Sequence, residues 1–236
     1  MDIARICALI PAYNEAEHIR TIVIEAQQVV PVVVINDGSI DSTAQIAESC
    51  GARVLNQIPN RGKGAALRLG FQYALQENYE AALTLDADGQ HEPSEIPKFL
   101  KAYVESRADL IIGARNFKEM PPARRLANTL GQWSFSWAVG QSIQDNQSGY
   151  RLISHRLMEA VLESKEQGFE FEVEMIVTCL QFGYTLEWIP IQTIYAGEQS
   201  HIQPAKHVLN FIHMLQKTRS QIQRTKKRAG SPLLKD

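Results

Sequence analysis

Short apolar runs alternate with amphipathic segments through the first half of this chain, and this alternation restricts the fold more than any other feature. The runs are too short for buried helices and end at turn residues, so each predicts a strand, at 6–10, 32–35, 53–55, 81–85 and 109–112. Helical periodicity and capping residues predict helices between them, at about 14–28, 42–50, 65–76 and 94–105. Apolar strands separated by helices predict an α/β fold, with a mostly parallel sheet and helices on both of its faces.

The second half of the chain is less regular. We expect helices at about 124–140 and 170–182, a polar turn at 145–151 that runs into a short strand, a strand at 186–191 and a last helix at about 204–217. The sequence has no linker rich in Pro, Gly or Ser and no internal repeat. Residues 1–217 are therefore predicted to form one domain, followed by a basic and flexible tail at 218–236.

Composition excludes several classes of protein. A net charge of −2 over 236 residues argues against a general nucleic-acid binder. The three cysteines are scattered, so we expect free thiols in a reducing compartment rather than a disulfide or a zinc site. We find no signal peptide and no apolar run near the roughly 20 residues that cross a bilayer, so a cytoplasmic protein is expected, soluble or peripheral to a membrane.

Polar residues follow several of the predicted strands, at the point where each strand ends. Acidic residues follow three of them (Glu15, Asp37, and Asp86 with Asp88), and Arg115 follows another. Parallel strands end at the same rim of a sheet, and ligands of such sheets bind beyond that rim. Turn formation explains a single Asp or Asn, but not acidic residues after three converging strands, so we expect a binding site there.

Asp86 and Asp88 are the centre of that prediction. Side chains two positions apart on a strand point to the same side, so the two carboxylates would lie together and favour a proton or a cation. With Gln90 as a third ligand, the set would offer oxygen atoms, which suit Mg2+ or Mn2+ better than zinc. The alternative is a polar turn in which Asp and Gly are only turn formers.

Six short motifs extend the pattern over most of the chain. They are, in order, Pro11-Ala12-Tyr13-Asn14-Glu15, Asn36-Asp37-Gly38-Ser39-x-Asp41-x-Thr43, Gly62-Lys63-Gly64-Ala65-Ala66-Leu67, Asp86-Ala87-Asp88-Gly89-Gln90-His91, Gly113-Ala114-Arg115 and Asp145-x-Gln147-Ser148-Gly149-Tyr150-Arg151. With these motifs the chain resembles the family 2 glycosyltransferases, particularly their dolichyl-phosphate mannosyltransferase-like branch, the polyprenyl-phosphate glycosyltransferases. The resemblance covers roughly residues 5 to 202.

The resemblance implies a GT-A fold, with a nucleotide-binding part at about 1–115 and an acceptor part at about 116–217. It implies an inverting transfer of a sugar from a nucleotide-diphosphate donor, GDP-mannose or a UDP-sugar, with a divalent ion. A cation held by Asp86, Asp88 and Gln90 would stabilise the negative charge that develops on the departing diphosphate.

The resemblance also assigns residues to the nucleotide. They are Pro11 and Ala12 through their backbone, Tyr13 by stacking on the base, Glu15 towards the ribose, Asp37 towards base nitrogens, Lys63 in a loop suited to anions, and Asp86. Other interpretations stay open for three of them. Glu15 could complement a helix dipole, Asp37 could be a turn carboxylate, and Lys63 could be a solvated surface lysine.

The implied acceptor is a polyprenyl phosphate, such as dolichyl or undecaprenyl phosphate. Its second ionisation, at about pH 6, leaves much of it ready to act as a nucleophile, so a strong base is less necessary than arginines that bind the phosphate. Arg115 and Arg125 match the family's positions for this role, although the sequence does not separate Arg124 from Arg125. Asp145 is the candidate for a base or a sugar-positioning carboxylate, and it could equally be a cap.

One loop departs from the family. Mannosyltransferase relatives carry Arg-x-x-Gly-Glu-Ser-Lys near residues 194–201, whereas this chain lacks the Arg and has His201 where the Lys would stand. The sugar, the base and the acceptor therefore stay open, as does the oligomeric state.

Two alternative functions also stay open. One is a GT-A transferase that acts on a sugar or lipid hydroxyl with Asp145 as its base, and the other is a non-catalytic nucleotide-sugar-binding module. A nucleotidyltransferase or a dinucleotide oxidoreductase is not favoured, because no Gly-rich phosphate loop follows the first strand. We expect the segment with Trp133 and Trp137 to contact a membrane surface, although these tryptophans could also be core residues. We expect the last helix to pack on the domain, with membrane docking of the basic tail as the alternative.

Overall fold

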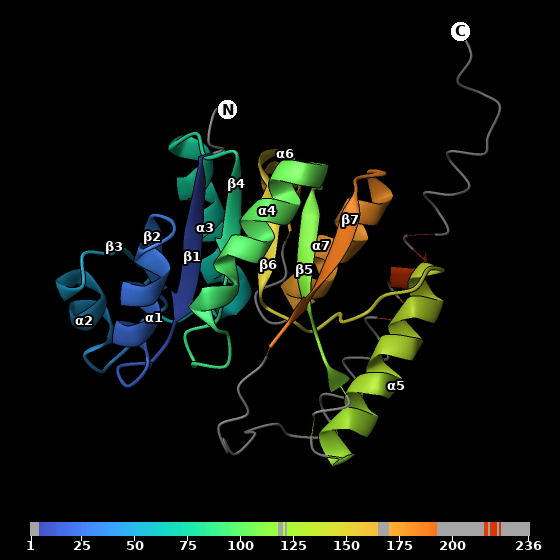
Figure 1. The fold of residues 1–236 in the computed structure, drawn as a ribbon, viewed down its shortest axis with the longest axis horizontal. Helices are drawn as coiled ribbons and strands as arrows, with labels where there is room; N and C mark the ends of the chain where they lie inside the picture. The colour runs from blue at the N-terminus through green and yellow to red at the C-terminus, as the bar shows by residue number, and fades with distance from the viewer. Residues whose placement is uncertain are drawn as a thin grey trace, which may run out of the picture.

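A computed structural model gives the fold and describes residues 5–117, 120, 122–164, 170–192, 215–216, 218–220 and 222. In this part of the chain, one seven-stranded sheet lies between helices (Figure 1). The strands are β1 (Ile6–Ala12), β2 (Val32–Asn36), β3 (Arg53–Asn56), β4 (Ala81–Thr84), β5 (Leu110–Arg115), β6 (Arg151–Ser154) and β7 (Leu186–Ile191). The helices are α1 (Ile19–Gln27), α2 (Thr43–Ser49), α3 (Lys63–Gln76), the 3-10 turn η1 (Pro93–Glu95), α4 (Ile96–Ser106), α5 (Pro122–Val139), α6 (His155–Val161) and α7 (Glu170–Gln181).

The strand order is β3-β2-β1-β4-β6-β5-β7. All neighbouring pairs are parallel except those of β6, which runs antiparallel to both β4 and β5. A parallel strand requires a crossover that returns the chain to the other end of the sheet. After β5, α5 stays beside the end at which β5 finishes, so the chain enters β6 from that same end (Figure 1). The predicted α/β fold with a mostly parallel sheet is confirmed.

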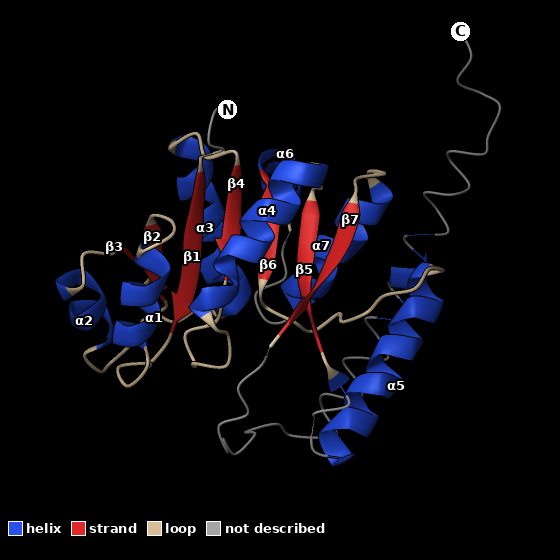
Figure 2. Ribbon diagram, in the orientation of Figure 1, coloured by secondary structure: helices blue, strands red, loops and turns tan. Residues whose placement is uncertain are grey.

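Side chains alternate along β1 between two apolar cores, one on each face of the sheet. Ala8 and Ile10 belong to the core that α1, α2 and α4 cover, whereas Cys7 and Leu9 belong to the core that α3, α6 and α7 cover. Figure 2 shows α1 and α4 in front of the strands and α3 and α7 behind them. Both faces are buried in this way, which explains why the strands are apolar at nearly every position.

Most predicted elements are present, with ends that differ by a few residues. The predicted apolar face of α1 is the buried one, but the helix begins at Ile19 rather than near residue 14. Asn14 has a left-handed backbone, with φ of 56°, and the Glu15 amide donates to Thr43 Oγ1, so this segment forms a turn instead. Helix α6 was not predicted, because residues 155–161 are too few for a clear periodicity.

The C-terminal predictions fall mostly on residues that the structure does not describe. The expected helix at 204–217 lies outside the described residues, apart from helical Leu215 and Gln216, and so does His201. Thr218 and Ile222 are described and buried. Both lie just past residue 217, and most of the expected tail is outside the described residues, so its flexibility stays a prediction.

Candidate active site

The polar loops meet at one rim of the sheet, where the parallel strands end. Ala12 of β1 is level with Asn36 of β2, so the loops after these two strands start side by side. Arg151, the first residue of antiparallel β6, is level with Thr84 of β4 and with Ile112 of β5. The reversed direction of β6 thus brings the loop before it, residues 145–150, to the same rim as the loops after β4 and β5.

The loop after β1 leaves the Tyr13 ring exposed to solvent. The Asn14 amide donates to Ser39 Oγ at 3.0 Å, and Asn14 Oδ1 accepts from the Ile40 amide at 2.9 Å, so the loops after β1 and β2 are tied together. Tyr13 is 48% exposed, as a platform for a base requires, while Pro11 and Ala12 are the last residues of β1. The Ala12 carbonyl already accepts from the Asp37 amide at 2.9 Å.

Asp37 lies at the rim but points to the loop that precedes α3. Its carboxylate accepts from the Arg61 and Gly62 amides, each at 2.8 Å, and from the Gln57 side chain. Gly62 has φ of 90°, which favours glycine, so this contact also fixes the turn into α3. Asp37 is only 3% exposed, and its contact with a nucleotide base stays a prediction.

The loop after β4 carries Asp86, Asp88 and Gln90. β4 ends at Thr84, so these residues lie in a tight loop, and the strand alternation that predicted parallel carboxylates does not apply. The Asp86 amide donates to His91 Nδ1 at 3.0 Å, and the Gln90 amide donates to Asp88 Oδ1 at 3.0 Å. His91, which we had not singled out, is buried in this loop against the Tyr150 ring. Burial lowers the pKa of His91, so the ring is neutral at pH 7 and accepts this hydrogen bond.

This loop fits a divalent ion that is completed by other ligands. Asp86, Asp88 and Gln90 are partly exposed and offer oxygen atoms, the ligands that Mg2+ and Mn2+ prefer. Within the described residues, no group of three or more His, Cys, Asp or Glu side chains could hold a metal ion. An ion held here would take further ligands from water or from a bound diphosphate, which is the chemistry that a nucleotide donor supplies.

Lys63, the first residue of α3, connects the loop after β4 to helix α7. Its ammonium forms an ion pair with Asp86 Oδ1 and lies 2.8 Å from Glu172 Oε1 in the first turn of α7. Burial, the largest single effect, would raise the pKa of Asp86, but Lys63 together with other charged neighbours lowers it to about 2. Burial alone would lower the pKa of Lys63, but Asp86 and Glu172 raise it above its usual range. Lys63 is therefore a fixed cation inside the site, not a solvated surface lysine.

Arg115 and Asp145 form a second ion pair at the rim. Arg115 Nε donates to Asp145 Oδ2 at 2.6 Å and Nη2 donates to Oδ1 at 2.9 Å. Asp145 is 1% exposed and also accepts from the Gln147 amide. The structure thus brings these two predicted residues together.

Arg125 is exposed in the first turn of α5, and no contact between it and Arg115 or Asp145 is among the described interactions. The side chain of Arg124 lies outside the described part of the structure.

Two buried residues of the site were missed from the sequence. Arg151 is fully buried and donates to the carbonyl oxygens of Ser148, Asn146 and Glu172, so it fixes the 146–148 loop and the start of α7. Its place at the end of a motif was a signal that we did not use. Glu172 belongs to no motif, and only its position among the acidic residues that open a predicted helix could have drawn attention to it.

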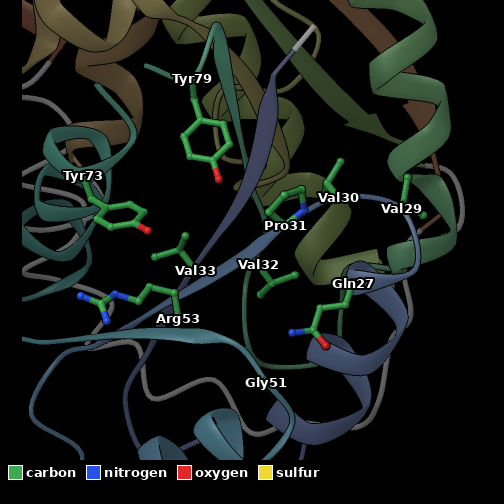
Figure 3. Close-up of a pocket in the computed structure, with 10 residues that line it drawn as sticks. All are labelled: Gln27, Val29, Val30, Pro31, Val32, Val33, Gly51, Arg53, Tyr73 and Tyr79. Carbon is green, nitrogen blue, oxygen red and sulfur yellow. The ribbon is translucent and has the colours of Figure 1, made fainter. Parts of the chain in front are cut away.

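A hollow of about 560 Å³ lies at the opposite end of the sheet (Figure 3). It is lined by residues near the starts of β2 and β3, including Val32 and Arg53, and by Tyr73 and Tyr79. None of the predicted site residues lines it, so it is separate from the rim.

Among the described helices, none combines the length and the apolar character that a bilayer span requires. The helix with the most exposed apolar residues is α5, where Leu126, Leu130, Trp133 and Trp137 are each more than half exposed.

Comparison with known proteins shows the family to which this chain is similar. Residues 7–162 match the family model described as glycosyl transferase family 2. The glycosyltransferase AglJ of Haloferax volcanii is 33% identical over 212 residues, which cover 85% of this chain and 67% of that protein. The undecaprenyl-phosphate mannosyltransferase of Micrococcus luteus is 29% identical over 204 residues, 79% of this chain and 82% of that protein.

A third relative carries a different sugar in its name. The UDP-N-acetylglucosamine–dolichyl-phosphate N-acetylglucosaminyltransferase of Methanococcus voltae is 26% identical over 213 residues, 79% of this chain and 84% of that protein. Among solved structures, the glucosyl-3-phosphoglycerate synthase of Mycobacterium tuberculosis with Mn2+, UDP-glucose and phosphoglyceric acid matches 92% of this chain and 80% of that chain. Its TM-score is 0.71 at 16% identity, which confirms the GT-A fold.

Proposed function

Because the chain belongs to glycosyl transferase family 2, we propose that it transfers a sugar from a nucleotide-diphosphate donor to a polyprenyl phosphate, with inversion at the sugar. The relatives that are named for mannosyl transfer to undecaprenyl phosphate and for N-acetylglucosaminyl transfer to dolichyl phosphate support this acceptor. They differ in the sugar, so a GDP-sugar and a UDP-sugar are both candidate donors.

One observation carries the choice of acceptor, namely the buried pair of Asp145 and Arg115. A hydroxyl acceptor requires a base that can reach the reacting oxygen and take its proton. Both oxygens of Asp145 are bound by Arg115, and the side chain is 1% exposed, so it is poorly placed for that task. A phosphate acceptor brings its own negative charge and requires a cation instead, which Arg115 provides.

In this proposal, Tyr13 stacks on the base, Glu15 lies towards the ribose, and Asp37 holds the loop that borders the base. Asp86, Asp88 and Gln90 hold Mg2+ or Mn2+ against the diphosphate, and the ion supplies positive charge where the leaving group becomes negative. Arg115 and Arg125 bind the acceptor phosphate, and Asp145 holds Arg115 in place. Residues up to about 115 bind the nucleotide, and later residues bind the acceptor.

A lipid acceptor also requires contact with a membrane, and we assign that contact to α5. Its exposed residues Leu126, Leu130, Trp133 and Trp137 recur at helical spacing and form one stripe, while Phe135 and Val139 on another face are buried. Residues 120–144 include two arginines and no acidic residue. An apolar stripe with tryptophans on a helix without acidic residues is typical of a helix that lies in the surface of an anionic membrane.

The donor is tested by a thermal-shift panel of GDP- and UDP-sugars, each with and without Mn2+. A ligand that binds the folded protein raises Tm according to its affinity, so the true donor should stand out, and only when Mn2+ is present. Transfer is then measured with that donor and undecaprenyl or dolichyl phosphate. Metal-dependent binding without transfer to either lipid would contradict the proposed acceptor and favour a non-catalytic binding module or a hydroxyl acceptor.

A further inference from the structure

Three charged side chains from different parts of the fold meet at Asp86, in the loop after β4. Lys63 begins α3, Asp86 follows β4, and Glu172 lies in the first turn of α7, which follows β6 and α6 in the chain. The Lys63 ammonium contacts both carboxylates, and the exposed fractions of the Lys63, Asp86 and Glu172 side chains are 17%, 26% and 5%. The most buried of the three, Glu172, has no role in the proposed reaction so far.

The fold holds Glu172 in this place through its backbone. Fully buried Arg151 donates to the Glu172 carbonyl oxygen, and to the Ser148 carbonyl oxygen at 2.7 Å. The buried Glu172 Oε1 lies 2.8 Å from Lys63 Nζ, and this ion pair is its contact among the described interactions. A buried carboxylate requires a counter-charge, and Lys63 supplies it.

Gly149 leaves the space that this cluster occupies. A Cβ atom at Gly149 would lie 2.6 Å from Asp86 Oδ2 and 2.8 Å from Lys63 Nζ, closer than real Cβ contacts allow. Thr84 Oγ1 donates to the Gly149 carbonyl at 2.8 Å and so prevents the backbone from moving away. A Cβ atom at this position would therefore displace the ends of the Lys63 and Asp86 side chains.

We propose that Glu172 is a positioning residue for the donor site, which shares the Lys63 ammonium with Asp86 and so keeps the Asp86 carboxylate open to a divalent ion. This inference rests on the proposed function. One ammonium between two carboxylates neutralises neither completely. When a divalent ion binds Asp86, Lys63 can shift towards Glu172 and remain paired, whereas without Glu172 it would lose this second carboxylate. Glu172 therefore lowers the free energy required for an ion to compete with Lys63.

The test is Glu172→Gln, which keeps the size of the side chain and removes its charge. The measurement is the Mn2+ concentration that gives half of the full thermal shift, with saturating GDP or UDP, whichever stabilises the unmodified protein. We expect this concentration to rise about 5-fold or more, as for a coupling of 1 kcal/mol or above. Glu172→Asp, which keeps the charge, should restore part of the effect. Glu170→Gln is the matched control on the same helix turn, because Glu170 has no ion pair among the described residues.

The outcomes are distinct. An Mn2+ midpoint in Glu172→Gln equal to that of Glu170→Gln would overturn the inference while the proposed function stands. If Glu172 had a purely structural role, Glu172→Gln would lower the Tm without ligand and leave the Mn2+ midpoint unchanged. This result would also overturn the inference. If Glu172→Gln does not fold, Gly149→Ala should raise the midpoint by displacing the same pair, and an unchanged midpoint there counts against the inference. Absence of any Mn2+-dependent shift in the unmodified protein would overturn the proposed function itself.

Discussion

Arg115 and Asp145 face each other side by side, with two nearly parallel hydrogen bonds of 2.6 and 2.9 Å between guanidinium and carboxylate. Asp145 is buried, whereas Arg115 keeps 16% of its side chain exposed. A guanidinium held along one edge by a carboxylate presents its remaining N–H groups in a fixed direction. Arg115 is thus oriented before any acceptor arrives.

We expect Asp145→Asn to reduce transfer by about 100-fold, because Arg115 loses the contact that orients it. The pH dependence of kcat should keep the shape of the unmodified enzyme, because Asp145 does not take a proton in the reaction. The measurement is a pH–rate profile of both proteins, with Tm as a control for folding. If the unmodified enzyme has an acidic limb that vanishes in the variant, Asp145 is a base and the acceptor is a hydroxyl.

Asp88→Ala should abolish transfer while the protein stays folded. Asp88 is partly exposed and accepts from the Gln90 amide within its own loop, so its loss should lower Tm by only a few degrees. Removal of a carboxylate that holds the ion should cost about 1,000-fold in kcat, since the departing diphosphate loses its cation. Excess EDTA should inactivate the unmodified enzyme in the same way, and Mn2+ should restore it. Exposed Ser94, just beyond the same loop, provides the control Ser94→Ala; full activity of Asp88→Ala or in EDTA would remove the metal site.

Tyr13→Ala should weaken nucleotide binding without affecting folding. Stacking of a base on an aromatic ring contributes about 1–3 kcal/mol, so we expect the Kd of the nucleotide to rise roughly 5- to 100-fold. Calorimetric titration with the nucleotide measures it. Phe182→Ala is the matched control, because Phe182 is 60% exposed and follows α7 at the end away from the rim. Equal affinities of the two variants would mean that Tyr13 is not the platform for the base.

The sequence predicted the rim because that prediction needs only that parallel strands end together and that polar residues follow them. Asp37, Asp86 and Arg115 come from the ends of three strands and lie there, and Lys63 at the start of α3 joins them through its ion pair with Asp86. The partners of these residues could not be predicted in the same way. Lys63 finds Glu172 across 109 positions of the chain, a contact that depends on the packing of α3 against α7.

The direction of β6 is a second feature that the sequence alone could not predict. A strand of only four residues reads alike in either direction, so the sequence predicted a strand here without its orientation. Because α5 stays beside the rim, the chain enters β6 from that end, and Arg151 is therefore the residue of β6 that lies at the site. The burial of Arg151 follows from that path, and a fully buried arginine is not expected from composition or periodicity.

Asp109, at the end of the sheet away from the site, should make stability depend on pH. Burial would raise its pKa, but hydrogen bonds from Arg156, Thr185 and Ser154 outweigh burial and lower it from 3.8 to about 2. A carboxyl with a lowered folded-state pKa stabilises the protein fully above its unfolded value, and this contribution is lost as pH falls towards 2. Asp109→Asn should lower the free energy of unfolding by about 1–3 kcal/mol at pH 7. Urea unfolding of both proteins from pH 6 to 2.5 should show this difference shrink below pH 4; a constant difference would contradict the pKa assignment.

The exposed stripe of α5 should bind membranes through Leu130 and Trp133, which are 55% and 70% exposed. We leave Trp137 out of the variant, because the Arg219 guanidinium lies 3.7 Å from its ring centroid and its loss would also disturb the C-terminal contact. Burial of each large apolar side chain in the membrane surface contributes about 1–2 kcal/mol, so Leu130→Ser with Trp133→Ser should lower the partition coefficient by more than about 10-fold. Co-sedimentation with vesicles of phosphatidylglycerol and phosphatidylcholine measures it, and Phe182→Ser is the control for loss of an exposed aromatic ring elsewhere.

The two serine substitutions should act on the lipid acceptor only. Transfer to a long-chain polyprenyl phosphate in vesicles should fall with the partition coefficient, whereas transfer to a short, water-soluble prenyl phosphate should stay unchanged, because the rim and its ion pairs are intact. Parallel loss of both activities would place Leu130 and Trp133 in the reaction site instead of the membrane contact. Unchanged sedimentation with vesicles would show that α5 is not the surface by which this enzyme reaches its lipid.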